Sequence, residues 1–141
     1  MFTGIEAELK AKLGKDWVVE FEDDSEGESE ICISWKNEEN WWVSIEGNKH
    51  IQKTMIYFGL RFDEDTSDIE YINELASKEK NYFLDFDTQG DWGIYKSIDS
   101  LNFKNEAKRE GLFNTDKIET MKKEAVKLVL MLIAIIEPHL E

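Results

Sequence analysis

The chain has 141 residues and a formal net charge of −14, from 31 acidic and 17 basic side chains. This charge argues against two kinds of partner that need a basic surface, nucleic acid and anionic membrane. A hydrophobic content of 41% and a single proline predict a folded chain, and the length predicts one domain over residues 1–141.

The acidic charge is concentrated in the N-terminal half. Residues 1–70 hold 18 acidic and 7 basic side chains, whereas residues 71–141 hold 13 and 10. The single cysteine, Cys32, cannot form an internal disulfide, and the N-terminus shows no signal-peptide pattern. We therefore expect a cytoplasmic protein. We also expect no membrane-spanning segment, because the apolar run at 128–136 is far shorter than the about 20 residues that a span needs.

The chain opens with a predicted helix over residues 4–13. Thr3 and Glu6 fit a capping box, in which each side chain bonds the other's backbone N–H. Apolar residues then recur at every fourth position: Ile5, Leu9 and Leu13. Gly14 suits the left-handed residue that often follows a helix end.

Four stretches with period-two alternation follow and predict β-strands. Their apolar positions, which would share one face, are Trp17, Val19 and Phe21, then Ile31, Ile33 and Trp35, then Trp41, Val43 and Ile45, and finally Ile56, Phe58, Leu60 and Phe62. Turn-forming residues separate the stretches. The pattern predicts a four-stranded antiparallel meander with one strongly apolar face.

The second half of the chain predicts a helix over 67–79, opened by a Ser67–Glu70 capping box. A hairpin is expected from strands at 82–86 and 92–96. Residues 97–114 show no clear period.

A long helix over 115–137 follows, capped by Thr115 or Asp116 and ended by Pro138. The resulting order, α-ββββ-α-ββ-α, predicts an α+β fold in which an antiparallel meander sheet of about six strands packs against the long C-terminal helix. The nine consecutive apolar residues at 128–136 must be covered by that sheet or by a second copy, so we also predict a homodimer.

An acidic cluster dominates the first predicted hairpin. Its members are Glu20, Glu22, Asp23, Asp24, Glu26, Glu28 and Glu30. Such a cluster can imitate a row of phosphates or attract a basic protein partner. The alternative is a solvated loop whose charges prevent edge-to-edge aggregation. The sequence leaves both interpretations open.

Three further patterns partly match metal-binding or catalytic motifs. Asp63, Asp65, Ser67 and Glu74 have calcium-loop spacing, but Asp68 replaces the glycine that the loop turn needs. Asp85 and Asp87 start a similar match that fails at Lys96. A metal-dependent nuclease is disfavoured because Ser34 stands two positions before Lys36, where an acid is required. His50 and His139 belong to no catalytic arrangement, so we expect no metal, no cofactor and no catalytic residues.

The second face of the predicted sheet is unusual in composition. The alternation places these residues there: Val18, Cys32, Ser34, Trp42, Ser44, Met55, Tyr57 and Arg61. Trp, Tyr, Met and Arg are enriched at protein interfaces. The alternative is that residues 97–114 or the N-terminal helix cover this face. Trp41 and Trp42 are adjacent and must point to opposite faces, so only one can lie in the main core.

These observations predict a small acidic, non-enzymatic interaction module that binds a basic protein partner. The order of elements and the acidity resemble, in architecture only, the small acidic chaperones of bacterial secretion systems; an immunity protein or inhibitor fits equally well. The predicted partner-binding residues are Trp42, Tyr57, Arg61, Met55, Glu20, Glu22, Asp23, Asp24, Glu26 and Glu28. The alternative is a small-molecule-binding or enzymatic domain with a pocket between sheet and helices, using Trp42, Tyr57, Arg61, Asp85 and Asp87.

Overall fold

The computed structural model describes residues 1–23, 28–48, 55–63, 69–89, 93–103 and 105–140. The α-helices are α1 (Phe2–Lys12), α2 (Ile69–Lys78), α3 (Glu106–Glu110) and α4 (Thr115–Ile136). The strands are β1 (Trp17–Asp23), β2 (Glu28–Trp35), β3 (Trp41–Asn48), β4 (Met55–Phe62), β5 (Asp87–Gln89) and β6 (Gly93–Asn102). The 3₁₀ turns Gly111–Phe113 and Glu137–His139 flank α4. The predicted α+β fold is confirmed, with α3 as an additional helix.

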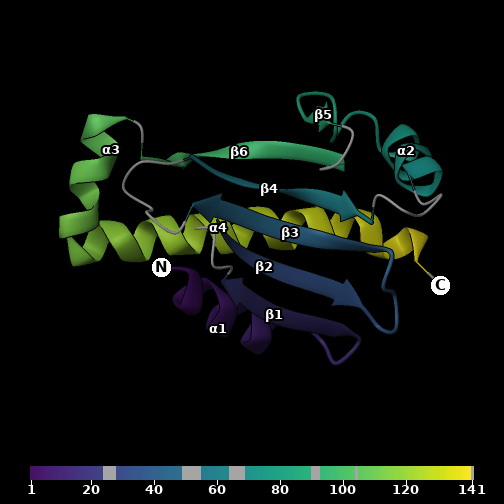
Figure 1. Ribbon diagram of the computed structural model, residues 1–141, viewed down its shortest axis with the longest axis horizontal. Coiled ribbons are helices and arrows are strands. Elements are labelled where there is room, and N and C mark those ends of the chain that lie inside the picture. The colour runs from purple at the N-terminus through teal and green to yellow at the C-terminus, as the bar shows by residue number, and fades with distance from the viewer. Residues whose placement is uncertain (24–27, 49–54, 64–68, 90–92, 104, 141) are drawn as a thin grey trace.

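The six strands form one antiparallel sheet in the order β1-β2-β3-β4-β6-β5 (Figure 1). Strands β1 to β4 follow the predicted meander. The next strand in the chain does not continue it, because β6 pairs with β4 and leaves the short β5 at the edge. The register aligns apolar residues across neighbouring strands, for example Ile31 with Ile45 and Ile45 with Phe58. One face of the sheet is therefore apolar, as the alternation predicted.

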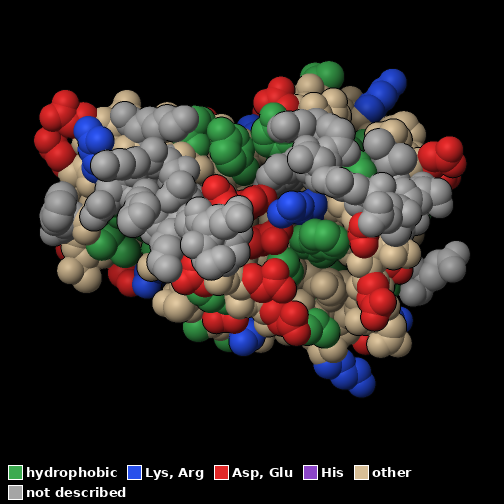
Figure 2. All heavy atoms as spheres, in the orientation of Figure 1, with side chains coloured by type: hydrophobic (Ala, Val, Ile, Leu, Met, Phe, Trp, Pro, Cys, Tyr) green, Lys and Arg blue, Asp and Glu red, His purple; other side chains and the backbone are tan. Residues whose placement is uncertain are grey.

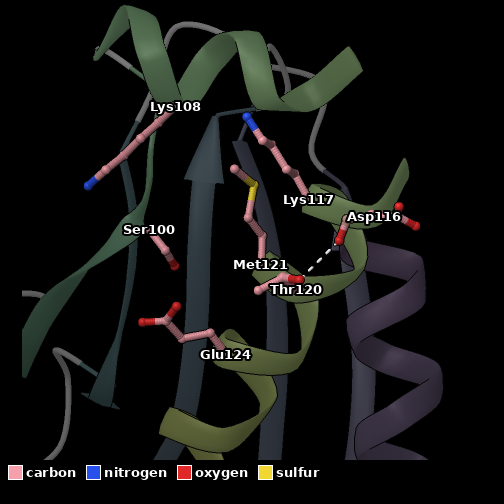
Figure 3. Close-up of a pocket in the computed structure, with 7 residues that line it drawn as sticks. All are labelled: Ser100, Lys108, Asp116, Lys117, Thr120, Met121 and Glu124. Atoms are coloured by element: carbon pink, nitrogen blue, oxygen red, sulfur yellow. Dashed lines mark hydrogen bonds between the residues drawn. The ribbon is translucent and has the colours of Figure 1, made fainter. Parts of the chain in front are cut away.

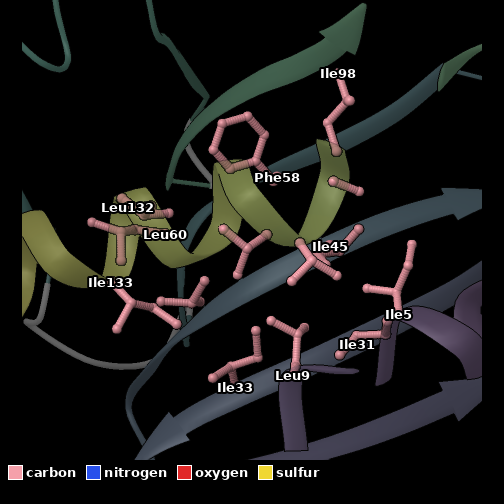
Figure 4. Close-up of a cluster of buried hydrophobic side chains, with 14 of the residues drawn as sticks. Ile5, Leu9, Ile31, Ile33, Ile45, Phe58, Leu60, Ile98, Leu132 and Ile133 are labelled. Carbon is pink, nitrogen blue, oxygen red and sulfur yellow. The ribbon is translucent and has the colours of Figure 1, made fainter. Parts of the chain in front are cut away.

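The hydrophobic core lies between this apolar face and the helices α1 and α4. Figure 1 shows α4 running behind the sheet, roughly along the direction of strands β3, β4 and β6. Figure 4 shows the contact layer, in which Ile5 and Leu9 of α1 and Leu132 and Ile133 of α4 meet the inward side chains of the sheet. Each fully buried side chain of this size stabilises the fold by about 1.5–3 kcal/mol through loss of apolar surface.

Helix α4 buries one continuous stripe at helical spacing: Ala125, Val126, Val129, Leu132, Ile133 and Ile136. Leu128, Leu130 and Ile135 are partly buried against the same core, and Met131 is 47% exposed. The sheet and α1 thus cover most of the apolar helix. The helix alone therefore no longer argues for a homodimer, which stays a prediction. Among the described helices, none is long and apolar enough to cross a membrane.

The N-terminal helix begins and ends differently from the prediction. Helix α1 starts at Phe2 with Met1 as N-cap and no capping bond from a side chain, so Thr3 does not cap it. The reason is burial, because Phe2 packs into the core with Ile5 and Leu9 and draws the first turn inward. The chain leaves the helix at Leu13 in an extended conformation, with φ −87° and ψ 148°, rather than through a left-handed Gly14.

The predicted strand at 82–86 is wrong. Backbone N–H groups of Tyr82 and Phe83 both donate to the Glu79 carbonyl, at 3.1 and 3.2 Å, which is a turn and not a strand ladder. Three aromatic rings explain the turn, because Tyr82, Phe83 and Phe86 have centroids only 4.9–5.3 Å apart. Adjacent residues of a strand face opposite ways, so a strand could not gather Tyr82 and Phe83 in this way. Strand β5 begins one residue after this aromatic turn.

Residues 97–114, for which the sequence showed no clear period, form the end of β6, then α3 and a 3₁₀ turn. Ile98, Leu101 and Phe103 are buried, which docks this segment on the core. Asparagine side chains cap both helices that follow: Asn105 accepts from the Lys108 N–H at 3.2 Å, and Asn114 from the Lys117 N–H at 3.1 Å. The N-cap of α4 is therefore Asn114, one residue before Thr115, and not Thr115 or Asp116 as predicted. The Ser67 cap predicted for α2 lies outside the described residues.

Candidate functional site

The candidate site is the outer face of the sheet, defined as the face turned away from α1 and α4. The strand register assigns to it Val18, Glu20, Glu22, Glu28, Glu30, Cys32, Ser34, Trp42, Ser44, Glu46, Tyr57, Gly59, Arg61, Tyr95 and Ser97. In the part of the chain that the structure describes, both helices packed along the sheet, α1 and α4, lie on the opposite face, as do Ile98, Leu101 and Phe103. Figure 2 shows acidic, basic and hydrophobic side chains side by side on this face.

A hydrogen-bonded network occupies the centre of the outer face. One oxygen of Glu30, Oε2, accepts from Trp42 Nε1 at 3.1 Å, from Arg61 Nη1 at 3.1 Å and from the Ser44 hydroxyl. Arg61 Nη1 also donates to Glu46 Oε2 at 3.2 Å. Two carboxylates thus share one guanidinium. The side chain of Glu30 is only 14% exposed, which makes these charge-assisted bonds stronger than they would be in open solvent.

The neighbouring carboxylates stabilise the charged form of Arg61. Burial alone would lower the pKa of the guanidinium, but the carboxylates of Glu30 and Glu46 outweigh it and the net shift of the pKa is upward. The guanidinium also lies 5.8 Å from the ring centre of Trp42, in cation–π range. The predicted residues Trp42 and Arg61 are therefore brought together.

Sequence reasoning missed the centre of this network. It placed Glu30 only in the acidic cluster and gave Glu46 no role. A signal was present, because the register sets Glu30 opposite Glu46, and like charges that face each other across strands need a cation. Arg61 is the one arginine among the described strand residues, so it was the natural candidate.

An aromatic and apolar area adjoins the network on β4 and β6. The rings of Tyr57 and Tyr95 meet edge to face with centroids 5.5 Å apart, and the Tyr57 hydroxyl lies 3.7 Å from the Met55 sulfur. The predicted residues Tyr57 and Met55 therefore belong to one cluster, to which the structure adds Tyr95. Gly59 allows β4 and β6 to approach here, because a Cβ at this position would lie 2.0 Å from the Ile94 carbonyl oxygen.

The acidic cluster is only partly on the outer face. Glu20, Glu22 and Glu28 are exposed and share the register of Glu30. Asp23 has the opposite orientation, and its carboxylate accepts from the Ser29 hydroxyl at 3.4 Å. Asp24 and Glu26 lie outside the described residues. The structure thus brings exposed carboxylates to the β1–β2 side of the network, next to Val18, whose side chain is 43% exposed.

Glu22, Glu30 and Cys32 come close enough to share one ion, with ligand atoms within 4.8 Å of one another. Burial, followed by the charges of Glu30 and Glu22, raises the pKa of the Cys32 thiol well above its usual range. A thiol must lose its proton to bind a metal, and Glu30 already accepts three hydrogen bonds. The triad is better explained as part of the acidic surface than as a metal centre.

The remaining sequence candidates do not join the network. The Lys96 ammonium donates to the exposed Asp85 carboxylate, and this hydrogen bond lowers the pKa of Asp85. Asp87 starts β5 opposite Tyr95. Glu74, from the calcium-like pattern, pairs with Lys78 on α2 at 3.4 Å, while Asp65, Ser67 and Asp68 lie outside the described residues. His139 pairs with Glu79 at 2.8 Å, and His50 is outside the described residues.

Among the cavities bounded by described residues, two lie on the helical side of the molecule. One, of about 340 Å³, is lined by residues of β6, α3 and α4 (Figure 3): Ser100, Lys108, Asp116, Lys117, Thr120, Met121 and Glu124. The other, of about 360 Å³, is lined by Lys12, Lys123, Val126, Lys127, Leu130, Met131 and Ala134. Trp42, Tyr57, Arg61, Asp85 and Asp87 were the residues predicted for a pocket, and they line neither cavity.

Comparison with protein-family models, with curated proteins and with solved structures finds no match for this chain. No residue role can therefore be carried over from another protein. The contacts, burial and charges of the outer face are the basis on which a function can be argued.

Proposed function

We propose that this protein is a non-enzymatic interaction module that binds a basic segment of a partner protein on its outer face. The observation that carries the proposal is the grouping of the exposed carboxylates of Glu20 and Glu22 with the half-buried ring of Trp42 on one face of the sheet. These two carboxylates present negative charge beside apolar surface. A lysine or arginine of the partner would complement that charge.

The surroundings of the network favour the same kind of ligand. Glu20 and Glu22 are exposed and form no ion pair within the described ranges, so they are available to attract a basic partner. Val18, Trp42 and Tyr57 supply apolar contact beside these charges. Apolar and aromatic contact next to complementary charge is the usual composition of a protein interface.

The charge of the surface also selects among partners. A second copy would bring the same carboxylates against Glu20, Glu22 and Glu30, and like charges repel at close range. A different, basic protein is therefore the favoured occupant of the outer face. A secretion chaperone, an immunity protein and an inhibitor that covers a nucleic-acid-binding site would all use this chemistry, and they differ only in the partner.

The proposal is tested by titration with a defined cationic peptide. A twelve-residue peptide of alternating lysine and valine is the probe, and a glutamate–valine peptide of equal length is its control. In amide NMR spectra we expect the lysine peptide to shift resonances of β1 to β4 on the outer face, with a Kd that weakens as salt rises. The glutamate peptide should cause no such shifts.

Variants separate local recognition from the general attraction of an acidic protein. The double substitution Glu20→Gln with Glu22→Gln should weaken peptide binding about five- to tenfold. Glu110→Gln with Glu137→Gln removes the same charge from exposed positions outside the sheet and should change the Kd less than twofold. Equal effects of the two double variants, or shifts scattered over the whole surface, would disprove the proposed role of the outer face.

A further inference from the structure

The cavity between β6, α3 and α4 has the size and composition of a small-molecule site. Its volume of about 340 Å³ falls at the lower end of the usual range for ligand pockets. It lies on the helical side of the molecule, and none of its lining residues belongs to the outer face. Its function is thus independent of the proposed protein binding.

One polar group in this cavity lacks a hydrogen-bond partner. The Ser100 hydroxyl oxygen is inaccessible to solvent and forms no hydrogen bond with any described residue. Buried hydroxyl groups are almost always paired, and an unpaired one points to a missing partner. In Figure 3 this hydroxyl, which comes from β6, is directed toward the carboxylate of Glu124, which comes from α4.

Glu124 is the charged group at this corner of the cavity. It is exposed and makes no ion pair within the residues that the structure describes. The two lysines of the lining are turned elsewhere, since the Lys108 ammonium donates to the Asp99 carbonyl and the Lys117 ammonium points toward α3 (Figure 3). The Thr120 hydroxyl donates to the Asp116 carbonyl at 3.0 Å and is already satisfied. A carboxylate and an unpaired hydroxyl are therefore the groups that a ligand would meet.

The wall beside this corner is apolar. The Met121 side chain packs close to Gly111, where an added Cβ would lie 3.0 Å from the Met121 methyl carbon and 3.5 Å from the Lys117 side chain. The aliphatic stems of Lys108 and Lys117 extend along the same region (Figure 3). Lysine stems commonly form apolar surface in this way while their ammonium groups remain solvated.

We infer that this cavity binds a small organic amine with an apolar body. The ammonium group donates to the Glu124 carboxylate and, after rotation about the Ser100 Cα–Cβ bond turns the buried hydroxyl into the cavity, to the Ser100 hydroxyl oxygen, while the alkyl part lies against Met121. An ammonium has three donors, so it satisfies both groups at once. An anionic ligand would instead face the like charge of Glu124.

The test is an NMR titration with primary alkylamines from ethylamine to hexylamine, with primary alcohols of equal length as controls. The amines should shift amide resonances of β6, α3 and the first half of α4, and bind at least tenfold more tightly than the alcohols. Titrations at about 300 mM salt suppress diffuse attraction to the acidic surface. Equal binding of amine and alcohol, or shifts outside these elements, would overturn the inference.

Single substitutions assign the two anchoring groups. Glu124→Gln should weaken amine binding at least tenfold, and Ser100→Ala should weaken it severalfold, while Glu137→Gln near the end of α4 should have no effect. Circular dichroism and the melting temperature of each variant establish that it is folded. If Glu124→Gln and Glu137→Gln bind the amines equally well, Glu124 is not an anchor and the inference fails. Peptide binding on the outer face is measured in a separate titration. Failure of amine binding in the cavity therefore leaves the proposed peptide binding untouched, and the reverse also holds.

Discussion

Arg61 Nη1 lies 3.1 Å from Glu30 Oε2, and this ion pair joins β4 to β2 across the intervening strand β3. The pair therefore spans two strand spacings. Two side chains of β3, Trp42 and Ser44, donate to the same Glu30 carboxylate oxygen. Three strands are thus linked by one half-buried carboxylate, in addition to their backbone hydrogen bonds.

Removing the guanidinium should destabilise the fold at neutral pH. We expect Arg61→Gln to lower the free energy of unfolding by about 1–3 kcal/mol, because it removes the charge-assisted hydrogen bonds that the guanidinium donates to the Glu30 and Glu46 carboxylates. Urea denaturation of the variant and of the unchanged protein measures this loss. Arg109→Gln, at the only other arginine, is the control and should change stability by less than about 0.5 kcal/mol.

Gly59 should tolerate no side chain. We expect Gly59→Ala to destabilise the protein by more than about 3 kcal/mol or to prevent folding, because its Cβ would overlap the β6 backbone at Ile94. The matched control is Gly14→Ala, where an added Cβ meets nothing within 4 Å. That variant should be neutral or slightly more stable, by up to about 1 kcal/mol. Thermal unfolding of both variants measures the difference. Equal melting temperatures would contradict the predicted intolerance of a side chain at Gly59.

The Cys32 thiol should be unreactive in the folded protein. Its raised pKa, caused by burial and by the carboxylates of Glu30 and Glu22, keeps it protonated at pH 8. We expect a disulfide reagent such as DTNB to modify it at least tenfold more slowly in the folded chain than in 6 M guanidinium chloride. Glu22→Gln should partly restore the rate. A folded-state rate equal to the unfolded one would show that the thiol is accessible and ionised.

Tyr82 should make stability depend on pH in the alkaline range. Burial, with a contribution from Asp85, raises its pKa to about 12 from an ordinary value of 10.0. Because the folded-state pKa is the higher one, the stabilising contribution is complete below pH 10 and is lost as pH rises toward 12. Denaturation at pH 8 and pH 11 should therefore show a loss of stability that is smaller in Tyr82→Phe. An identical pH dependence in both proteins would contradict this assignment.

Much of the fold was predictable because it depends on local pattern. Period-two alternation assigned the four meander strands and separated Trp41, which is buried, from Trp42, which is not. Helical spacing and Pro138 located the C-terminal helix within one residue at its end. Trp42, Tyr57, Arg61 and Met55 were placed on one face by the same alternation, without knowledge of strand order.

The tertiary structure decided which of these elements are neighbours. The insertion of β6 between β4 and β5 brought Tyr95 to Tyr57, and the turn at 82–86 replaced a strand because its aromatic rings could pack together. The pairing of Glu30 with Arg61, 31 residues apart, depends on the register of three strands. The unpaired Ser100 hydroxyl depends on how α4 packs against β6. Local periodicity determines which face a side chain occupies, whereas partners distant in sequence are set by the packing of the whole chain.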